Sequence, residues 1–289
     1  MVFHTLKIIC FCLVGWSSLL FAFTPLQAGC ANAQTHQPVT GFTLEEMEQG
    51  EQEMIRLVNA ERTKRGLMTY DFDEGLRLMA RKHSEDMCRR HYFSHQSPEG
   101  KTPQDRKEEY YPKLIGGTGE NIHQISVSPG FEEQGYEMKR LISEAHRDLM
   151  CSPKHKKNIL SKKFTHIGIG FFLTETEMLV TQNFAEEVAL SDELLPKIVQ
   201  NDSIITVKGE VRGKTNLNNL QAYLVIPDPK KECDNYDGTY SIGGYFLPVE
   251  KLTERKFKIS FSLDKGKGDY ELKLGERNYF YSGIKLIKE

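Results

Sequence analysis

Apolar residues in the first half of the chain recur at helical spacing. Residues 43–46 (Thr-Leu-Glu-Glu) form a capping box, and an apolar stripe then repeats every three or four positions until Gly66 supplies a C-terminal stop. Similar stripes predict a second helix from residue 74 to about residue 91 and a third over residues 136–150. Ser152-Pro153 predicts the start of a fourth, short helix.

The periodicity changes at Phe164. Ile167, Ile169 and Phe171 alternate with other residues, a polar turn follows at residues 174–177, and a second apolar run covers residues 179–184. This pattern predicts a β-hairpin. Helices followed by a hairpin predict an α+β domain over residues 43–188, with the helices packed against an antiparallel sheet.

The rest of the chain has only strand-like patterns. Residues 185–200 are acidic and weakly patterned, so we predict that they connect two domains. Over residues 200–289, short runs rich in Val, Ile, Tyr and Phe are separated by Gly, Pro, Asn and Asp. They predict a small all-β sandwich. An immunoglobulin-like arrangement is one alternative for this sandwich, but neither a Cys pair nor a core Trp supports it. The runs cover residues 204–211, 220–226, 239–247, 257–263, 270–274 and 279–287.

The N-terminus has the order of an export signal. Lys7 precedes an apolar run over residues 8–23, and small residues follow. A membrane-spanning helix needs roughly 20 apolar residues, so removal of residues 1–33 is favoured over anchoring. Two alternatives remain: cleavage at residues 31–33 (Ala-Asn-Ala), or a lipoprotein signal that places a lipid on Cys30. Either one predicts an extracellular or cell-envelope protein that contacts a membrane only through the signal or that lipid.

Charge and cysteine content narrow the classes of partner. The 38 basic and 40 acidic residues are interspersed and give a net charge of −2, which argues against a nucleic-acid partner. Export permits disulfides, and Cys88 with Cys151 is the candidate bridge inside the first domain. The alternative is that both are buried thiols.

Several motifs follow one another in a fixed order between residues 50 and 186. They are His-Ser-Glu-Asp-Met at 83–87, Tyr-Phe-Ser-His at 92–95, Gly-Glu-Asn-Ile at 119–122, Ser-Pro-Lys-His at 152–155, Asn-Ile-Leu at 158–160, Phe-Thr-His-Ile-Gly-Ile-Gly at 164–170 and Gln-Asn-Phe at 182–184. This set resembles the CAP superfamily of cysteine-rich secretory, antigen 5 and pathogenesis-related proteins, in its bacterial SCP-domain branch. The resemblance implies an α-β-α sandwich with a central cleft.

The resemblance also implies a metal site. Two histidines and two glutamates line the cleft in this family, and His95, Glu120 and His155 match three of these positions. Ser152 stands where the second glutamate is expected, so we predict a weakly bound Zn²⁺ or another divalent cation, or no cofactor. The alternative interpretation is structural: Glu120 accepts backbone hydrogen bonds and Asn121 shapes a turn. His83, on an apolar helix face, is interpreted as a core histidine whose hydrogen bonds are satisfied.

Two functions fit these residues. The first is a non-enzymatic extracellular module that binds a lipid, a peptide or an envelope component. The alternative is a metal-assisted hydrolase in which His95 and His155 bind Zn²⁺ while Glu120 is the third ligand or the base. The first is favoured because Ser94, although it adjoins His95, points the opposite way along an extended chain and is no activated nucleophile.

Overall fold

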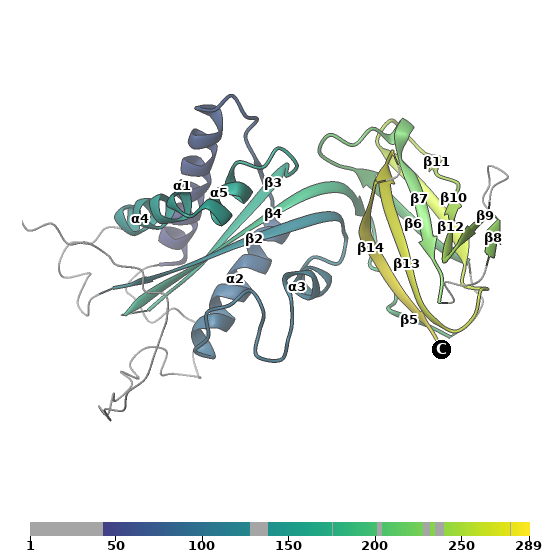
Figure 1. Ribbon diagram of the computed structural model, residues 1–289, viewed down its shortest axis with the longest axis horizontal. Coiled ribbons are helices and arrows are strands. Elements are labelled where there is room, and N and C mark those ends of the chain that lie inside the picture. The colour runs from purple at the N-terminus through teal and green to yellow at the C-terminus, as the bar shows by residue number, and fades with distance from the viewer. Residues whose placement is uncertain are drawn as a thin grey trace, which may run out of the picture.

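The computed structural model describes residues 43–127, 138–174, 176–200, 204–227, 232–234, 240–277 and 279–289. The predicted export signal and Cys30 lie outside the described residues. The described chain forms two domains side by side, and strand β4 (Glu177–Ser191) leads from the first to the second (Figure 1). Within the described ranges, no helix is long and apolar enough to cross a membrane.

The N-terminal domain is an α-β-α sandwich. Helices α1, α4 and α5 cover one face of its sheet, and α2 and α3 lie on the other (Figure 1). The bounds are α1 (Leu44–Thr63), β1 (Asp71–Phe72), α2 (Glu74–Arg89), α3 (Pro103–Tyr110), β2 (Leu114–Ser126), α4 (Met138–Cys151), α5 (Pro153–Ile159) and β3 (His166–Leu173). The predicted fold class is confirmed, and so are the hairpin β3–β4 and four of the helices. Helix α3 and strands β1 and β2 had no counterpart among the predicted elements.

Strand β4 organises the sheet because both of its edges are paired. One edge pairs antiparallel with β2 along most of its length, and the other pairs with β3. Beyond the end of β3, residues 189–191 pair with β6 of the second domain. The prediction that residues 185–200 form only a connection is therefore wrong for 185–191. The acidic residues of this segment suggested an exposed connection, but one of them, Glu187, is buried within the strand.

Two glycines let α2 lie directly on β3. A Cβ atom on Gly168 would come within 2.2 Å of the Arg77 backbone nitrogen, and one on Gly170 within 2.1 Å of that of Arg81. No other residue type fits so close an approach. The Ser84 hydroxyl then donates a hydrogen bond to the Gly170 carbonyl (3.0 Å). This contact fixes the rotation of α2 and, with it, the position of the neighbouring His83.

The C-terminal domain is all-β with two packed sheets, as predicted. One sheet has the order β10-β7-β13-β14-β5, and the other continues the N-terminal sheet through β6, β12 and β11. The bounds are β5 (Ile198–Val199), β6 (Ile204–Val211), β7 (Gln221–Val225), β8 (Glu232–Asp234), β9 (Tyr240–Ile242), β10 (Gly244–Leu247), β11 (Glu250–Lys251), β12 (Lys256–Ser262), β13 (Gly268–Glu276) and β14 (Tyr279–Lys288), with a 3-10 turn at Leu217–Asn219. Its core also takes in Ile115, Val188 and Ala189 from strands of the first domain. The two domains thus share buried apolar surface.

The cysteines do not pair as the sequence suggested. Cys88 takes part in a disulfide, whereas Cys151 is a free and exposed thiol. Neither alternative for Cys151, a bridge to Cys88 or a buried thiol, is correct. Helices α2 and α4, which carry the two cysteines near their C-terminal ends, pack on opposite faces of the sheet (Figure 1). A disulfide needs Cα atoms within about 7 Å, and the intervening sheet prevents this.

A lysine is buried next to the contact between the domains. Lys107, on α3, is fully buried, and its ammonium nitrogen has no hydrogen-bond partner in the described part of the chain. Burial lowers the pKa of Lys107 to about 8, although the carboxylates of Glu108 and Glu271 act in the opposite direction and Lys285 adds to the lowering. Because the charged amine is desolvated without a partner, it costs folding free energy at neutral pH.

We predict that Lys107→Met stabilises the protein at pH 7 by up to about 3 kcal/mol, the equivalent of the lowered pKa. Below pH 8 the lysine is charged in both the folded and the unfolded state, so the penalty is complete. Between pH 8 and about 10.4 the folded state loses the proton while the unfolded state keeps it, so the wild type gains stability as the pH rises.

Urea unfolding of both proteins at pH 7, 8, 9 and 10 measures this effect. The stability difference between variant and wild type should shrink as the pH rises. Lys64→Met, at an exposed lysine, is the matched control and should show no such trend. If the difference in unfolding free energy between Lys107→Met and the wild type stays constant from pH 7 to pH 10, the pKa of Lys107 is not lowered by burial.

Candidate functional site

Glu120 is the centre of the candidate site. It lies on β2 with a side chain only 2% exposed, and it meets the guanidinium of Arg106 from α3, which is 3% exposed. The Arg106 Nη2 donates to Oε1 (2.9 Å) and to Oε2 (2.8 Å). A buried carboxylate requires a partner of this kind, since leaving it unpaired would cost several kcal/mol. The pair therefore fixes α3 against β2.

His95 joins the same carboxylate. Its Nδ1 lies 2.8 Å from the Glu120 Oε1, and because an ionised carboxylate only accepts, this nitrogen carries the proton. The other ring nitrogen, Nε2, is left as an acceptor. The His95 side chain is 50% exposed, and Arg106 also donates to its main-chain carbonyl (2.9 Å). Arg106 therefore holds both the carboxylate and the segment that carries the histidine.

The electrostatics of the site favour an ionised Glu120. Burial by itself would raise the pKa of Glu120, but the hydrogen bond from His95, the nearby His83 ring and the Arg106 charge outweigh it and hold this pKa below its ordinary value. The carboxylate is thus charged at neutral pH, with the Arg106 charge beside it. A group in this state is a poor proton donor or acceptor for a reaction near pH 7.

His83 approaches Glu120 from α2. Its Nε2 lies 3.6 Å from Oε1 of Glu120, and the ring is fully buried. Burial lowers the pKa of His83 to about 4, with Glu120 opposing the shift and Arg106 adding to it, so the ring is neutral at pH 7. The interpretation as a core histidine is correct for its burial. It is wrong for its hydrogen bonds, because neither ring nitrogen has a partner among the described residues.

Amide side chains tie His155 to this region. Asn121, buried on β2, donates to the main-chain carbonyl of His155 on α5 (3.1 Å). Asn158 donates to the Asn121 side chain (2.9 Å) and to the Glu120 carbonyl (3.2 Å). The turn interpretation of Asn121 is therefore wrong. Burial and then the neighbouring His123 and His95 lower the pKa of His155, so both of these rings lie within electrostatic reach of His155.

Two serines considered from the sequence have structural positions. Ser152 is the N-cap residue of α5, and its side chain makes no capping hydrogen bond. The Ser94 hydroxyl accepts a hydrogen bond from the Gln96 backbone (3.1 Å), which shapes the turn after His95. This local contact agrees with the interpretation that Ser94 is no activated nucleophile.

Arg106 changes what the predicted metal ligands can do. Across the described ranges, no three His, Cys, Asp or Glu side chains are arranged to hold a metal ion. The guanidinium already contacts both oxygens of Glu120, and a fixed positive charge there opposes a divalent cation. Glu120 therefore fits the role of orienting His95 and does not fit that of a ligand. The nitrogens of His95 and His155 keep the chemistry of zinc ligands.

Comparisons with known proteins agree with the motifs. Residues 55–184 match the model described as CAP, cysteine-rich secretory protein family. YkwD of Bacillus subtilis (strain 168), an uncharacterised protein, is 36% identical over 134 residues, which are 46% of this chain and 46% of YkwD. The uncharacterised membrane protein YlbC of the same organism is 33% identical over 134 residues, 46% of this chain and 34% of YlbC.

A solved structure is similar to about half of the chain. An extracellular protein containing a SCP domain from Bacillus anthracis str. Ames shares 27% identity over 51% of this chain and 45% of that chain, with a TM-score of 0.40. The chain thus spans less than half the length of each of these three proteins.

The buried ion pair predicts a strong coupling between Arg106 and Glu120. Arg106→Met leaves Glu120 buried without its cation and should lower the free energy of unfolding by about 3–5 kcal/mol. The double variant Arg106→Met with Glu120→Gln should recover most of this loss, because no buried charge remains. Urea unfolding of the wild type, both single variants and the double variant gives the coupling energy. Additive effects would show that the pair is not the contact that holds α3.

Proposed function

We propose that residues 55–184, which match the CAP family model, form a domain of that superfamily, and that the protein is an exported, non-enzymatic binding module. Its ligand class is a lipid, a peptide or another component of the cell envelope. Export is supported by the apolar N-terminal run after Lys7 and the small residues behind it. Location outside the cytoplasm or in the envelope follows from that signal, with or without a lipid on Cys30.

The state of Glu120 carries the proposal. Its carboxylate is charged, buried and already neutralised by Arg106, so it is not available to take a proton from water or substrate. What faces solvent is the half-exposed ring of His95, held in one tautomer by that carboxylate. A fixed imidazole that offers Nε2 as an acceptor suits recognition of a hydroxyl or amide group.

The hydrolase alternative needs features that this site lacks. An oriented imidazole can act as a general base, and a carboxylate behind it can stabilise the imidazolium that forms. Here the positive charge of Arg106 on the same carboxylate weakens this stabilisation. Ser94, which adjoins His95, is engaged in a turn. The site geometry therefore supports binding over catalysis.

We propose that any divalent ion is held weakly, by His95 and His155 with Glu120 behind His95. Calorimetric titration of the full chain with Zn²⁺ should show an affinity that falls as the pH drops below about 6.5, because metal ligation requires neutral imidazoles and burial lowers the pKa of His155. His155→Ala should abolish the heat without loss of folding. Ser152→Glu should strengthen binding by adding a ligand and a negative charge. If neither the wild type nor Ser152→Glu binds any divalent ion, the metal hypothesis is wrong.

The binding function itself is tested by co-sedimentation of the full chain with purified peptidoglycan sacculi and with phosphatidylglycerol vesicles. We expect the wild type to sediment with one of them and the double variant His95→Ala/His155→Ala to lose about tenfold in affinity, as removal of two hydrogen-bonding rings implies. His91→Ala, at an exposed histidine, is the control and should bind normally. Turnover of peptide or ester substrates that depends on His95 would instead support the hydrolase.

A further inference from the structure

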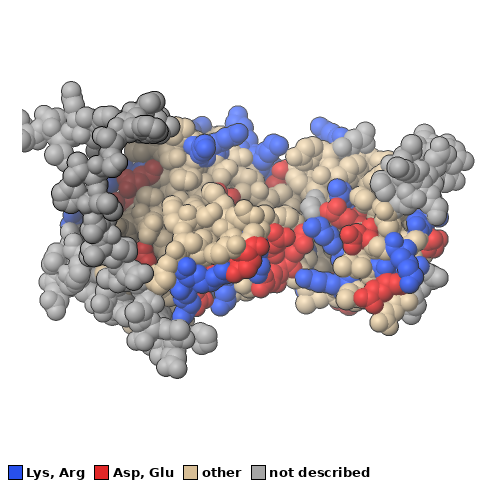
Figure 2. Space-filling model, turned by 60° about the horizontal axis from the view of Figure 1, so that its bottom comes forward, with Lys and Arg blue, Asp and Glu red and all other residues tan. Residues whose placement is uncertain are grey.

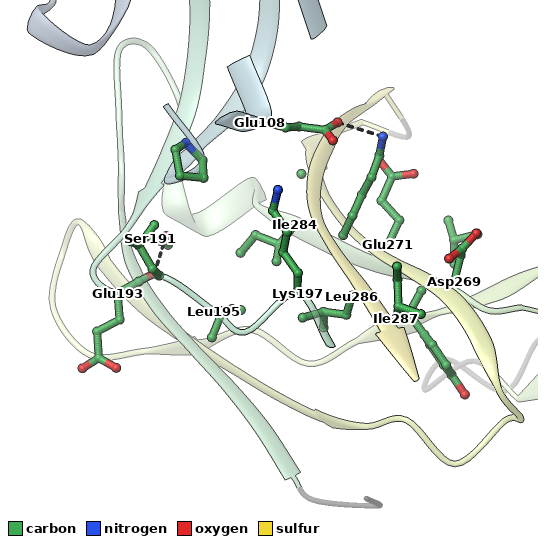
Figure 3. Close-up of a pocket in the computed structure, with 16 residues that line it drawn as sticks. Glu108, Ser191, Glu193, Leu195, Lys197, Asp269, Glu271, Ile284, Leu286 and Ile287 are labelled. Carbon is green, nitrogen blue, oxygen red and sulfur yellow. Dashed lines mark hydrogen bonds and ion pairs between the residues drawn. The ribbon is translucent and has the colours of Figure 1, made fainter. Parts of the chain in front are cut away.

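A cavity of about 440 Å³ opens between the two domains, away from His95 and Glu120. The last turn of α3, the segment of residues 191–197 and strand β14 form its walls (Figure 3). This volume is within the usual range of ligand-binding clefts. Glu108, on the first domain, reaches across to Lys285 on β14 (2.8 Å) and closes one side.

Strand β14 presents a backbone edge to this cavity. The short strand β5 pairs with β14 at Ile287 and Lys288, where the Ile287 N–H donates to the Lys197 carbonyl (2.7 Å). Backbone groups of alternate residues in a strand point to the same edge, so those of Lys285 point the same way as those of Ile287. In the described part of the chain, no strand pairs with β14 at Lys285 on that side. The segment before β5 diverges from β14 at Lys285, and the cavity lies between this segment and β14.

The side chains around the cavity are apolar and acidic. Among the apolar lining residues, Leu194 and Ile287 are exposed and Leu195 is half-buried, whereas Ile284 and Leu286 belong to the buried core of the second domain. Figure 3 shows Leu195 and Ile287 beside the cavity. The charged side chains that line the cavity are four carboxylates and two amines, at Glu108, Glu193, Asp269, Glu271, Lys197 and Lys285.

The pairing of these charges leaves an acidic excess. Glu108 is paired with Lys285, and Glu271 has Lys273 at 3.4 Å. Glu193, Asp269 and Lys197 have no ion-pair partner among the described residues, so two carboxylates and one amine of the lining are left unpaired. Figure 2 shows acidic side chains gathered on this face near the junction of the domains, with basic ones beside them. A ligand with a positive charge complements this lining.

We propose that this cavity binds a short extended peptide with alternating apolar and basic side chains. The peptide would add a strand to β14, so that its main chain pairs with the backbone groups of Lys285 and its basic side chains meet Glu193 and Asp269. In β-augmentation, main-chain hydrogen bonds supply affinity and pockets for alternate side chains supply specificity. This site is separate from the His95 region and does not depend on the function proposed for it.

The probe for the test is the blocked peptide acetyl-Val-Lys-Val-Lys-Val-amide, titrated into the ¹⁵N-labelled full chain by NMR. We expect the amide signals of Lys285 and Ile287 to shift on binding. Two matched peptides separate the contributions: one with glutamate in place of lysine, and one with N-methylated valines, which cannot pair with a strand edge. Both should bind at least about tenfold more weakly, a loss of the size expected when a charge contact or a strand pairing is removed.

Variants of the chain test the same contacts. Glu193→Gln/Asp269→Asn should weaken binding of the lysine peptide at least about tenfold. The control Glu254→Gln/Asp264→Asn removes two exposed carboxylates elsewhere and should bind like the wild type. His95→Ala/His155→Ala should also bind like the wild type, which separates this site from the one proposed above. The proposal is overturned if the lysine peptide does not bind, or if the glutamate or N-methylated peptide binds equally well.

Discussion

Strand β4 is the element on which the rest of the structure depends, because it must find hydrogen-bond partners for both edges over its whole length. An unpaired buried backbone group costs about as much as a lost hydrogen bond, so a long central strand fixes its neighbours. It takes β2 on one edge and β3 on the other, and β6 takes over where β3 ends. As a result one sheet runs through both domains, and their cores meet at Val188 and Ala189.

This sheet also determines which chemistry is possible at the candidate site. Pairing of β2 with β4 buries Glu120, and the glycines of β3 bring α2 close enough to place His83 beside it. The carboxylate then needs a positive partner, because a buried charge without one costs several kcal/mol. Arg106 meets this need with one guanidinium that contacts both oxygens. The same contact that makes the buried carboxylate tolerable removes it from metal binding and proton transfer.

The sequence predicted the elements that have strong periodicity. Four helices, the β3–β4 hairpin and most strands of the second domain follow from apolar stripes and alternation, and the motifs placed His95 and Glu120 in one site. Strands β5, β8 and β11 had no counterpart among the predicted runs. Helix α3 was missed because it has almost no apolar stripe, although Thr102, Pro103 and Asp105 carry the signal of a capped helix start. Arg106 was missed with it. The partner of Arg106 lies on another element of the chain. The sequence alone does not distinguish an arginine that is buried by such a contact from one that is exposed.

Helix α3 links the two sites through consecutive residues. Successive residues on a helix point about 100° apart, so Arg106, Lys107 and Glu108 face different directions. Arg106 reaches Glu120, Lys107 is buried near the domain contact, and Glu108 pairs with Lys285 beside the cavity. The helix has eight residues and few apolar contacts of its own, so these charged contacts determine its position. Because one short helix carries both contacts, the His95 site and the cavity between the domains are attached to the same eight residues.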